Sequence, residues 1–195
     1  MFDFLVELVT GSPWVYPFGL AVIVFDAVVP VLPSETLLIT GGVLAARGQI
    51  SPAGLMAVGF AGAVIGDNIT YTLGWGYGAR ARDRLFRSEK ARSRLEKAKE
   101  LLDERPWLVA VARFVPGGRT AMTFAAGTLA MPRRRFLVYI IPGGLAWSVF
   151  VSLLGYVGGP VFQGSFWLPL AASLGFAAVL AAGAEALRRA RARRA

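Results

Sequence analysis

The sequence contains no cysteine and no histidine. Without cysteine the chain can form neither a disulfide bond nor a thiolate ligand for a metal. Without histidine it lacks the commonest general base and the commonest transition-metal ligand. These absences exclude a histidine-dependent hydrolase or metalloenzyme. We therefore expect no enzymatic activity, no catalytic residue, no metal site and no cofactor.

Charged residues are also scarce. They make up 17% of the 195 residues, whereas 55% are hydrophobic and the mean hydropathy is +0.56. No residue from Phe136 to Ala184 is charged, and this 49-residue stretch is long enough for two crossings of a bilayer at about 20 residues each. This composition excludes a disordered chain and predicts an all-α integral membrane protein, with residues 1–195 in a single membrane domain.

The net charge of +9 comes from basic residues that gather beside the apolar segments. Ten of the 21 Lys and Arg residues lie in residues 80–105, three are Arg133–Arg135, and five follow Glu185. Such clusters are typical of the cytoplasmic loops of membrane proteins. Because no separate basic module is present, the charge does not indicate nucleic-acid binding. We predict a multi-pass protein of the bacterial plasma membrane with a cytoplasmic C-terminus.

The apolar residues fall into six segments, which are 14–32, 34–46, 52–79, 107–131, 136–159 and 166–187. We divide the chain into a first repeat, an amphipathic linker, a second repeat, a C-terminal helix and a basic tail, with the boundaries 14–79, 80–106, 107–160, 165–187 and 188–195. Each repeat is predicted to contain a hairpin and a full crossing. The linker is predicted to be a solvated or interfacial helix on the cytoplasmic side.

The charge pattern also predicts how the segments cross. With the arginine clusters inside, segment 107–131 must begin and end on the same side of the membrane. Its Pro116-Gly117-Gly118 break therefore predicts a re-entrant hairpin that enters the membrane and returns. In the first half, Pro30 and Pro33 interrupt segment 14–46, which is either an opposed hairpin or two short complete crossings.

A short internal match supports a symmetric arrangement. Gly42-Val-Leu-Ala45 in the first half recurs as Gly127-Thr-Leu-Ala130, 85 positions later. Each copy follows a proline-containing break and precedes a long apolar crossing. We therefore expect an inverted repeat with two opposed re-entrant helical hairpins, full transmembrane crossings and an additional C-terminal transmembrane helix. Many secondary transporters are built in this way.

Five ionisable residues lie inside or beside these breaks and crossings, where charge is costly. Arg113 and Arg119 flank the second break. Asp26 and Glu35 flank the first break, and Asp67 lies in the middle of the long crossing that follows it. Such residues either hold the hairpins together as charge pairs or mark substrate and proton paths. We expect the acids of one hairpin to pair with the arginines of the other until an anionic ligand arrives.

Arginine suits a phosphate ligand because its planar guanidinium donates two parallel hydrogen bonds. We therefore predict that Arg113, Arg119 and the adjacent Thr120 bind a phosphate. The helix that begins after Pro116 would add the positive end of its dipole at the same place. The three carboxylates would form the resting ion pairs or carry protons, which allows coupling to a proton gradient.

The order of these motifs resembles that of a known family. The motifs are Phe25-Asp26-x3-Pro30-x2-Pro33-Ser34-Glu35, Gly66-Asp67-x3-Tyr71-x2-Gly74, Ala112-Arg113-Phe-Val-Pro116-Gly117-x-Arg119-Thr120, Ala126-Gly127-x3-Met131-x4-Phe136 and Gly144-x2-Trp147. In kind and order, over roughly residues 14–160, they resemble the DedA family of membrane proteins, which are also called SNARE-associated or VTT-domain proteins.

The resemblance implies opposed re-entrant hairpins and a role in moving lipids across the bilayer, with Asp26, Glu35, Arg113 and Arg119 at the positions that matter. It predicts a lipid transporter, or flippase, for an anionic lipid phosphate such as undecaprenyl phosphate. The partners would be a lipid phosphate or phospholipid, with or without protons, and the protein would act as a monomer or a homo-oligomer. The alternatives are a proton-coupled transporter of a small cation or drug with structural arginines, and a scaffold without transport.

Overall fold

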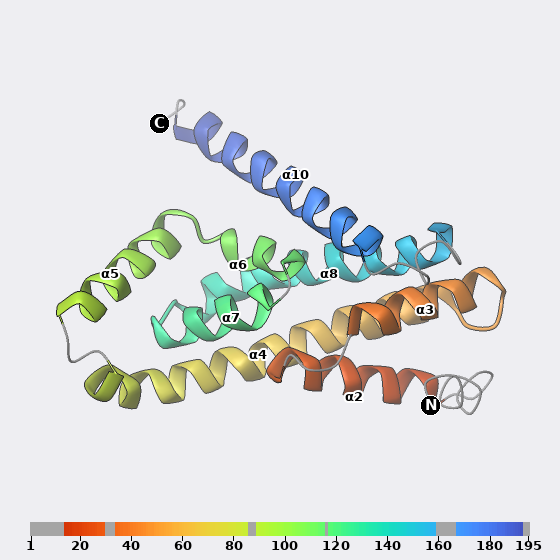
Figure 1. The fold of residues 1–195 in the computed structure, drawn as a ribbon, viewed down its shortest axis with the longest axis horizontal. Coiled ribbons are helices and arrows are strands. Elements are labelled where there is room, and N and C mark those ends of the chain that lie inside the picture. The colour runs from red at the N-terminus through yellow and green to blue at the C-terminus, as the bar shows by residue number, and fades with distance from the viewer. Residues whose placement is uncertain (1–13, 30–33, 86–88, 116, 159–166, 193–195) are drawn as a thin grey trace. The chain divides into compact units, whose positions relative to one another are not determined.

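A computed structural model describes residues 14–29, 34–85, 89–115, 117–158 and 167–192. All of the described secondary structure is helical (Figure 1), which confirms the prediction of an all-α protein. The helices in chain order are α2 (Val15–Val28), α3 (Ser34–Ala46), α4 (Pro52–Leu85), α5 (Glu89–Glu104), α6 (Leu108–Val111), the short 3-10 helix η1 (Ala112–Phe114), α7 (Gly118–Thr128), α8 (Arg133–Gly158) and α10 (Trp167–Ala192).

The chain divides into two compact units, and each unit combines one hairpin with parts of the same two long helices. Unit 1 comprises residues 1–67 and 144–170, so it contains α2, α3, the first half of α4 and the later part of α8. Unit 2 comprises residues 68–143 and 171–195, so it contains the rest of α4, α5 to α7, the start of α8 and most of α10. The units therefore cut across the predicted sequence repeats, because α4 and α8 contribute to both.

Within the described residues, two helices are long and apolar enough to cross a bilayer. These are Pro52–Gly78 of α4, with 27 residues, and Arg133–Gly158, the whole of α8, with 26. Helices α2, α3 and α7 have 14, 13 and 11 residues, whereas a crossing needs about 20. The apolar part of α10, Leu174–Leu187, is also short. The re-entrant topology and the crossing by α10 remain predictions.

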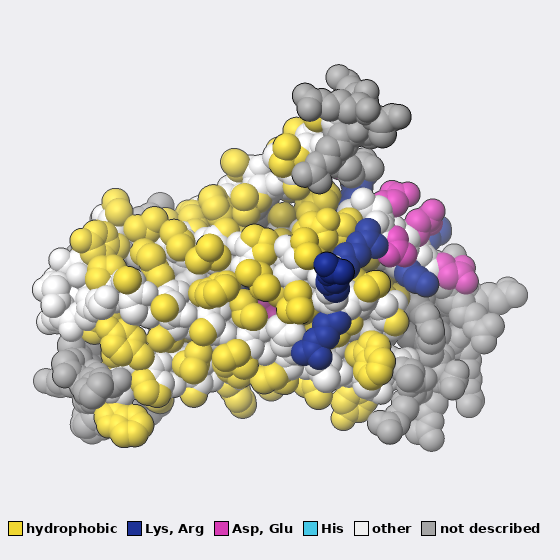
Figure 2. Space-filling view, turned by 180° about the vertical axis from the view of Figure 1, so that it is seen from behind, with side chains coloured by type: hydrophobic (Ala, Val, Ile, Leu, Met, Phe, Trp, Pro, Cys, Tyr) yellow, Lys and Arg dark blue, Asp and Glu magenta, His cyan; other side chains and the backbone are white. Residues whose placement is uncertain are grey.

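Large hydrophobic side chains cover much of the surface. Examples with more than half of their surface exposed are Phe25, Val138, Val157 and Val179. Figure 2 shows hydrophobic side chains over most of the visible face, while most of the Lys, Arg, Asp and Glu side chains visible there gather in one region. An apolar surface of this extent suits contact with lipid tails rather than with water.

Two helices continue beyond the apolar segments that the sequence delimits. Helix α4 runs to Leu85 rather than ending at residue 79, and α10 runs to Ala192, inside the segment expected to be a basic tail. Both extensions are rich in alanine and arginine, which have high helix propensity. Hydropathy therefore delimits the apolar part of each helix and does not mark where the helix ends.

In unit 1, α2 runs parallel to the first half of α4 in a constant register (Figure 1). A side chain on Gly62 would lie 2.9 Å from the Cβ of Ile23, and one on Gly66 would overlap the Cβ of Ala27. The partners in each contact are 39 positions apart. Glycine at these two positions lets the helix axes approach closely, which fixes the first arm of the hairpin on α4.

The second arm of this hairpin, α3, packs on α8 with backbone against backbone. A side chain on Gly42 would overlap the carbonyl of Ser152 and lie 2.7 Å from the amide nitrogen of Tyr156. A side chain on Gly155 would overlap the carbonyl of Ile39. Neither position can accept a Cβ atom unless one helix moves.

Unit 2 contains a corresponding contact between α7 and α4. A side chain on Gly127 would overlap the carbonyl of Tyr71 and lie 2.8 Å from the amide nitrogen of Trp75. A side chain on Gly74 would overlap the carbonyl of Phe124. The second arm of this hairpin is therefore also held by direct backbone contact.

The two contacts are related by constant shifts along the chain. Gly42 and Ile39 of α3 correspond to Gly127 and Phe124 of α7, 85 positions later, and the glycines that they meet on α8 and α4 differ by 81 positions. In each case the second arm packs on the long helix of the other predicted repeat. The short sequence match at Gly42 and Gly127 thus marks a repeated packing contact.

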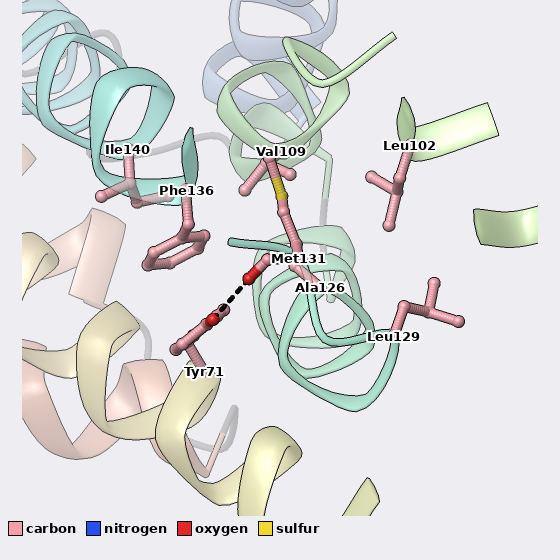
Figure 3. Close-up of a cluster of buried hydrophobic side chains, with 8 residues drawn as sticks. All are labelled: Tyr71, Leu102, Val109, Ala126, Leu129, Met131, Phe136 and Ile140. Carbon is pink, nitrogen blue, oxygen red and sulfur yellow. Dashed lines mark hydrogen bonds between the residues drawn. The ribbon is translucent and has the colours of Figure 1, made fainter. Parts of the chain in front are cut away.

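A buried apolar cluster joins α7 to its neighbours in unit 2 (Figure 3). Its members are Tyr71, Leu102, Val109, Ala126, Leu129, Met131, Phe136 and Ile140. The Tyr71 ring stacks on Phe136 with 4.5 Å between centroids, and its hydroxyl donates to the carbonyl of Met131 at 2.5 Å. Because Met131 follows α7 and Phe136 lies in the first turn of α8, this tyrosine ties both helices to α4.

Helix α5, the predicted linker helix, is fixed at its C-terminal end. Leu102 is buried in the cluster, while Leu101 is exposed. Arg135, at the start of α8, donates to the Asp103 carboxylate at 3.0 Å and to the Asp103 carbonyl at 2.5 Å. The arginine therefore satisfies a carbonyl in the last turn of α5, where no helical partner is available.

Gly127→Ala is expected to destabilise the protein by about 1–3 kcal/mol, because the new methyl group would overlap the Tyr71 carbonyl and force α7 away from α4. The matched control is Gly76→Ala on α4, where a Cβ would meet no described atom within 4 Å. It should gain up to about 1 kcal/mol from the higher helix propensity of alanine. Thermal unfolding in detergent measures both, and equal midpoints for the two variants would contradict the packing described.

Tyr71→Phe should lower stability by about 1–3 kcal/mol, because the ring can still stack on Phe136 but the buried Met131 carbonyl loses its donor. Tyr77→Phe provides the control on the same helix, since 59% of the Tyr77 side chain is exposed. Its effect should stay within about 0.5 kcal/mol. The same thermal measurement distinguishes them, and a Tyr71→Phe protein as stable as the parent would show that the hydrogen bond contributes nothing.

Candidate functional site

Three buried charged side chains occur among the described residues. They are Asp67, Arg113 and Arg119, whose exposed fractions are 0%, 3% and 8%. All three are predicted site residues. Removing a charge from water costs several kcal/mol before any compensation from partners. The burial of these three charges therefore marks their positions as candidates for a functional site.

Arg113 is positioned by the first arm of the second hairpin. Helix α6 approaches α8 at Gly143, where an added Cβ would lie 2.9 Å from the Cβ of Ala110. Helix η1 continues α6, and its Phe114 contacts Phe176 of α10 edge to face at 5.1 Å. The Nη1 atom of Arg113 donates to the Ile140 carbonyl of α8 at 3.5 Å. Packing on α8 and α10 therefore fixes this guanidinium in the interior of unit 2.

Arg119 and Thr120 lie in the first turn of α7. The preceding Gly117 has φ of 69°, a left-handed conformation that glycine adopts at little cost, and it forms the N-cap. Arg119 is buried and Thr120 is partly buried. The positive end of the α7 dipole lies at this first turn. The dipole and the Arg119 guanidinium therefore both favour an anion near the start of α7. Pro116 lies outside the described residues.

Asp26 and Glu35 lie on opposite sides of the first break. Asp26 belongs to the last turn of α2 and Glu35 to the first turn of α3, and both are partly buried. The hydroxyl of Ser34, which is buried, donates to Oδ2 of Asp26 at 2.6 Å. This bond closes the break and holds the Asp26 carboxylate beside the start of α3. Pro30 and Pro33 lie outside the described residues.

The predicted site residues divide by charge between the two units. The carboxylates all belong to unit 1, whereas Arg113, Arg119 and Thr120 all belong to unit 2. Each hairpin therefore carries one sign of charge, as the sequence suggested. The predicted pairing of acids with arginines connects different units and stays a prediction.

Thr123 is a candidate that the sequence reasoning missed. It lies four positions after Arg119 on the buried face of α7, and only 1% of its side chain is exposed. Its Oγ1 atom has no hydrogen-bond partner in the part of the chain that the structure describes. A polar residue one helical turn from a buried arginine was the available signal, because positions four apart share a helix face.

Comparison with known proteins places the chain in a family. The VTT-domain profile matches residues 32–157. An uncharacterised membrane protein of Mycobacterium tuberculosis is 35% identical over 194 residues, covering 90% of this chain and 81% of its own length. Protein DedA of Escherichia coli is 29% identical, with 80% and 75% covered. Undecaprenyl phosphate transporter A of Bacillus subtilis is 28% identical, with 73% of each covered. No solved structure gives a significant match.

The matched region extends from just before α3 almost to the end of α8, so it contains the second hairpin and both long helices. It also contains four of the five motifs on which the resemblance rests, and part of the first. The apolar surface and the two membrane-length helices agree with relatives that are named as membrane proteins. The chain belongs to the VTT-domain family and is a DedA-family membrane protein.

Proposed function

We propose that this protein transports an anionic lipid phosphate across the bacterial plasma membrane, and that Arg113, Arg119 and Thr120 bind the phosphate group. The observation that carries the proposal is the burial of two guanidinium groups in one short hairpin, six positions apart. Buried arginines at a helix N-terminus form a site whose charge and hydrogen-bond geometry both suit a phosphate. The name of the Bacillus subtilis relative supports undecaprenyl phosphate as the lipid.

The proposed topology has two opposed re-entrant hairpins, full crossings by α4 and α8, a further crossing by α10 and a cytoplasmic C-terminus. The lengths of α2, α3 and α7 support it, because none reaches the roughly 20 residues of a complete crossing. The repeated glycine contacts of α3 and α7 support the inverted repeat. In this arrangement short helix ends inside the membrane would face the lipid headgroup.

The carboxylates complete the proposal as proton carriers or as resting counter-ions of the arginines. Asp26 and Glu35 lie at the break of the first hairpin and are partly buried, which suits groups that exchange protons. Asp67 is fully buried in the middle of α4. Neutralising Asp26 or Glu35 would then uncouple lipid movement from the proton gradient, while the phosphate would still bind to unit 2.

One observation favours a second candidate, a proton-coupled transporter of a small cation or drug. Arg113 donates to the Ile140 carbonyl, which is a contact that a purely structural arginine would make. In that case the carboxylates would bind the substrate, and the arginines would only balance their charge. Both candidates are transporters rather than enzymes.

Arg119→Ala is expected to reduce the movement of a fluorescent lipid phosphate across reconstituted vesicles by tenfold or more, since a hydrogen bond to a charged group contributes about 1.5–3 kcal/mol. Arg119→Lys should retain part of the activity, because lysine keeps the charge but loses the planar fork. The control is Arg134→Ala, an exposed arginine at the start of α8, which should leave transport unchanged.

Insertion and folding of each variant are checked by gel filtration and by its thermal midpoint. If correctly folded Arg113→Ala and Arg119→Ala proteins move the lipid phosphate as fast as the parent, the proposed function is wrong. Proton flux that depends on a soluble cation, without lipid movement, would establish the second candidate instead.

A further inference from the structure

The hydroxyl of Thr123 is buried on α7 without a hydrogen-bond partner among the described residues. A hydroxyl that leaves water without finding a partner destabilises the folded state. Buried polar groups of this kind are few in native proteins, and each calls for an explanation such as a bound ligand or ion. Thr123 is therefore a position where an acceptor from a bound group would satisfy a buried hydroxyl.

Thr123 does not make the hydrogen bond that a threonine in a helix commonly makes to its own backbone. Helical threonines can donate to the carbonyl four residues earlier. Thr72 of α4 does so at 2.7 Å to Asn68, and Thr128 of α7 does so at 3.0 Å to Phe124. Thr123 makes no such bond, so its hydroxyl can still donate to another acceptor.

The side chain of Thr123 lies over the turn that begins with Arg119. Positions four apart share one face of a helix, and Cα–Cβ bonds tilt towards the helix N-terminus. The hydroxyl is thus carried towards the first turn of α7, where the buried guanidinium and the positive end of the helix dipole already favour an anion. The next buried residues on this face, Ala126 and Gly127, are apolar, so the polar part of the face ends at Thr123.

We propose that the Thr123 hydroxyl donates a hydrogen bond to the phosphate group that Arg119 binds. This inference rests on the proposed function and adds a binding residue to its site. A phosphate has several acceptor oxygens, and a planar guanidinium engages two of them. A hydroxyl placed one turn further along α7 reaches an oxygen that the guanidinium leaves available, so the headgroup is recognised by two successive turns of one helix.

The test compares Thr123→Val with Thr128→Val, which is the same change on the same helix at a hydroxyl that already has a backbone acceptor. Each variant and the parent are placed in phosphatidylcholine nanodiscs, and two probes are titrated: phosphatidic acid added to the bilayer, and inorganic phosphate in solution. Thermal midpoints are recorded without either probe. Thr123→Ser is included because it keeps the hydroxyl.

Thr123→Val is expected to bind phosphatidic acid about tenfold more weakly than the parent, while its midpoint without ligand stays equal or rises. Thr128→Val should bind as the parent does, with an equal or lower midpoint, and Thr123→Ser should keep most of the affinity. Weaker binding of inorganic phosphate as well would assign the contact to the phosphate group in any form. An effect on phosphatidic acid alone would assign it to a lipid-borne phosphate.

The proposal is overturned if Thr123→Val binds phosphatidic acid as tightly as the parent, or if Thr128→Val loses as much affinity. Failure of the proposed function gives a different result. In that case Arg119→Ala also binds phosphatidic acid at parental strength. Loss of binding in Arg119→Ala but not in Thr123→Val would leave the transporter proposal standing and remove only the threonine from the site.

Discussion

Backbone-to-backbone contact through glycine is the constraint on which the rest of the fold depends. A short helix that does not span the bilayer gains little from hydrophobic burial among lipid tails, so it must be held by close packing on a longer helix. Gly42 and Gly155 provide this contact for α3, and Gly127 and Gly74 provide it for α7. A methyl group at any of these positions would separate the helices. Because the starts of α3 and α7 carry Glu35 and Arg119, the same contacts decide where the charged side chains lie.

This packing determines where the charged side chains lie, and it holds two arginines in the interior of unit 2. A guanidinium in the interior is costly unless partners compensate it, and the second hairpin fixes two of them, one on η1 and one on α7. Arg113 is bound to α8 through Ile140, whereas Arg119 lies in the first turn of α7, at the positive end of its dipole. The two arginines therefore differ in their surroundings: Arg113 donates to a carbonyl of α8, and Arg119 lies where the helix dipole favours an anion. The first hairpin uses the opposite sign and a shorter link, since Ser34 binds Asp26 directly across the break.

Much of the fold and most of the candidate site residues could be predicted from the sequence, because apolar segments and the isolated charges within them are easy to recognise. The apolar segments, the breaks before α3 and α7 and the isolated charges at Asp67, Arg113 and Arg119 are visible without a structure. The ends of the helices were harder to predict. Helix α4 continues to Leu85 because its polar end has high helix propensity, although its hydropathy is low there. The partners of α3 and α7 could not be predicted at all: a glycine shows that something approaches closely but not which helix does so. Thr123 was missed for a related reason, since only the structure shows that its hydroxyl has no hydrogen-bond acceptor among the described residues.

The packing of α3 on α8 and of α7 on α4 also determines the order in which these contacts can form during synthesis. Helix α3 is complete at Ala46, but the surface that covers Gly42 belongs to α8 and is not synthesised until about 110 residues later. Helix α7 has no such delay, because α4 has already been synthesised when Gly127 is added. During synthesis α2 can pack on α4, but α3, with Glu35 in its first turn, must wait until Gly155 arrives. Helix α7 can dock on α4 as it forms, so Arg119 reaches its packing early, whereas Arg113 must wait for Ile140 of α8 and for the Phe176 contact of α10.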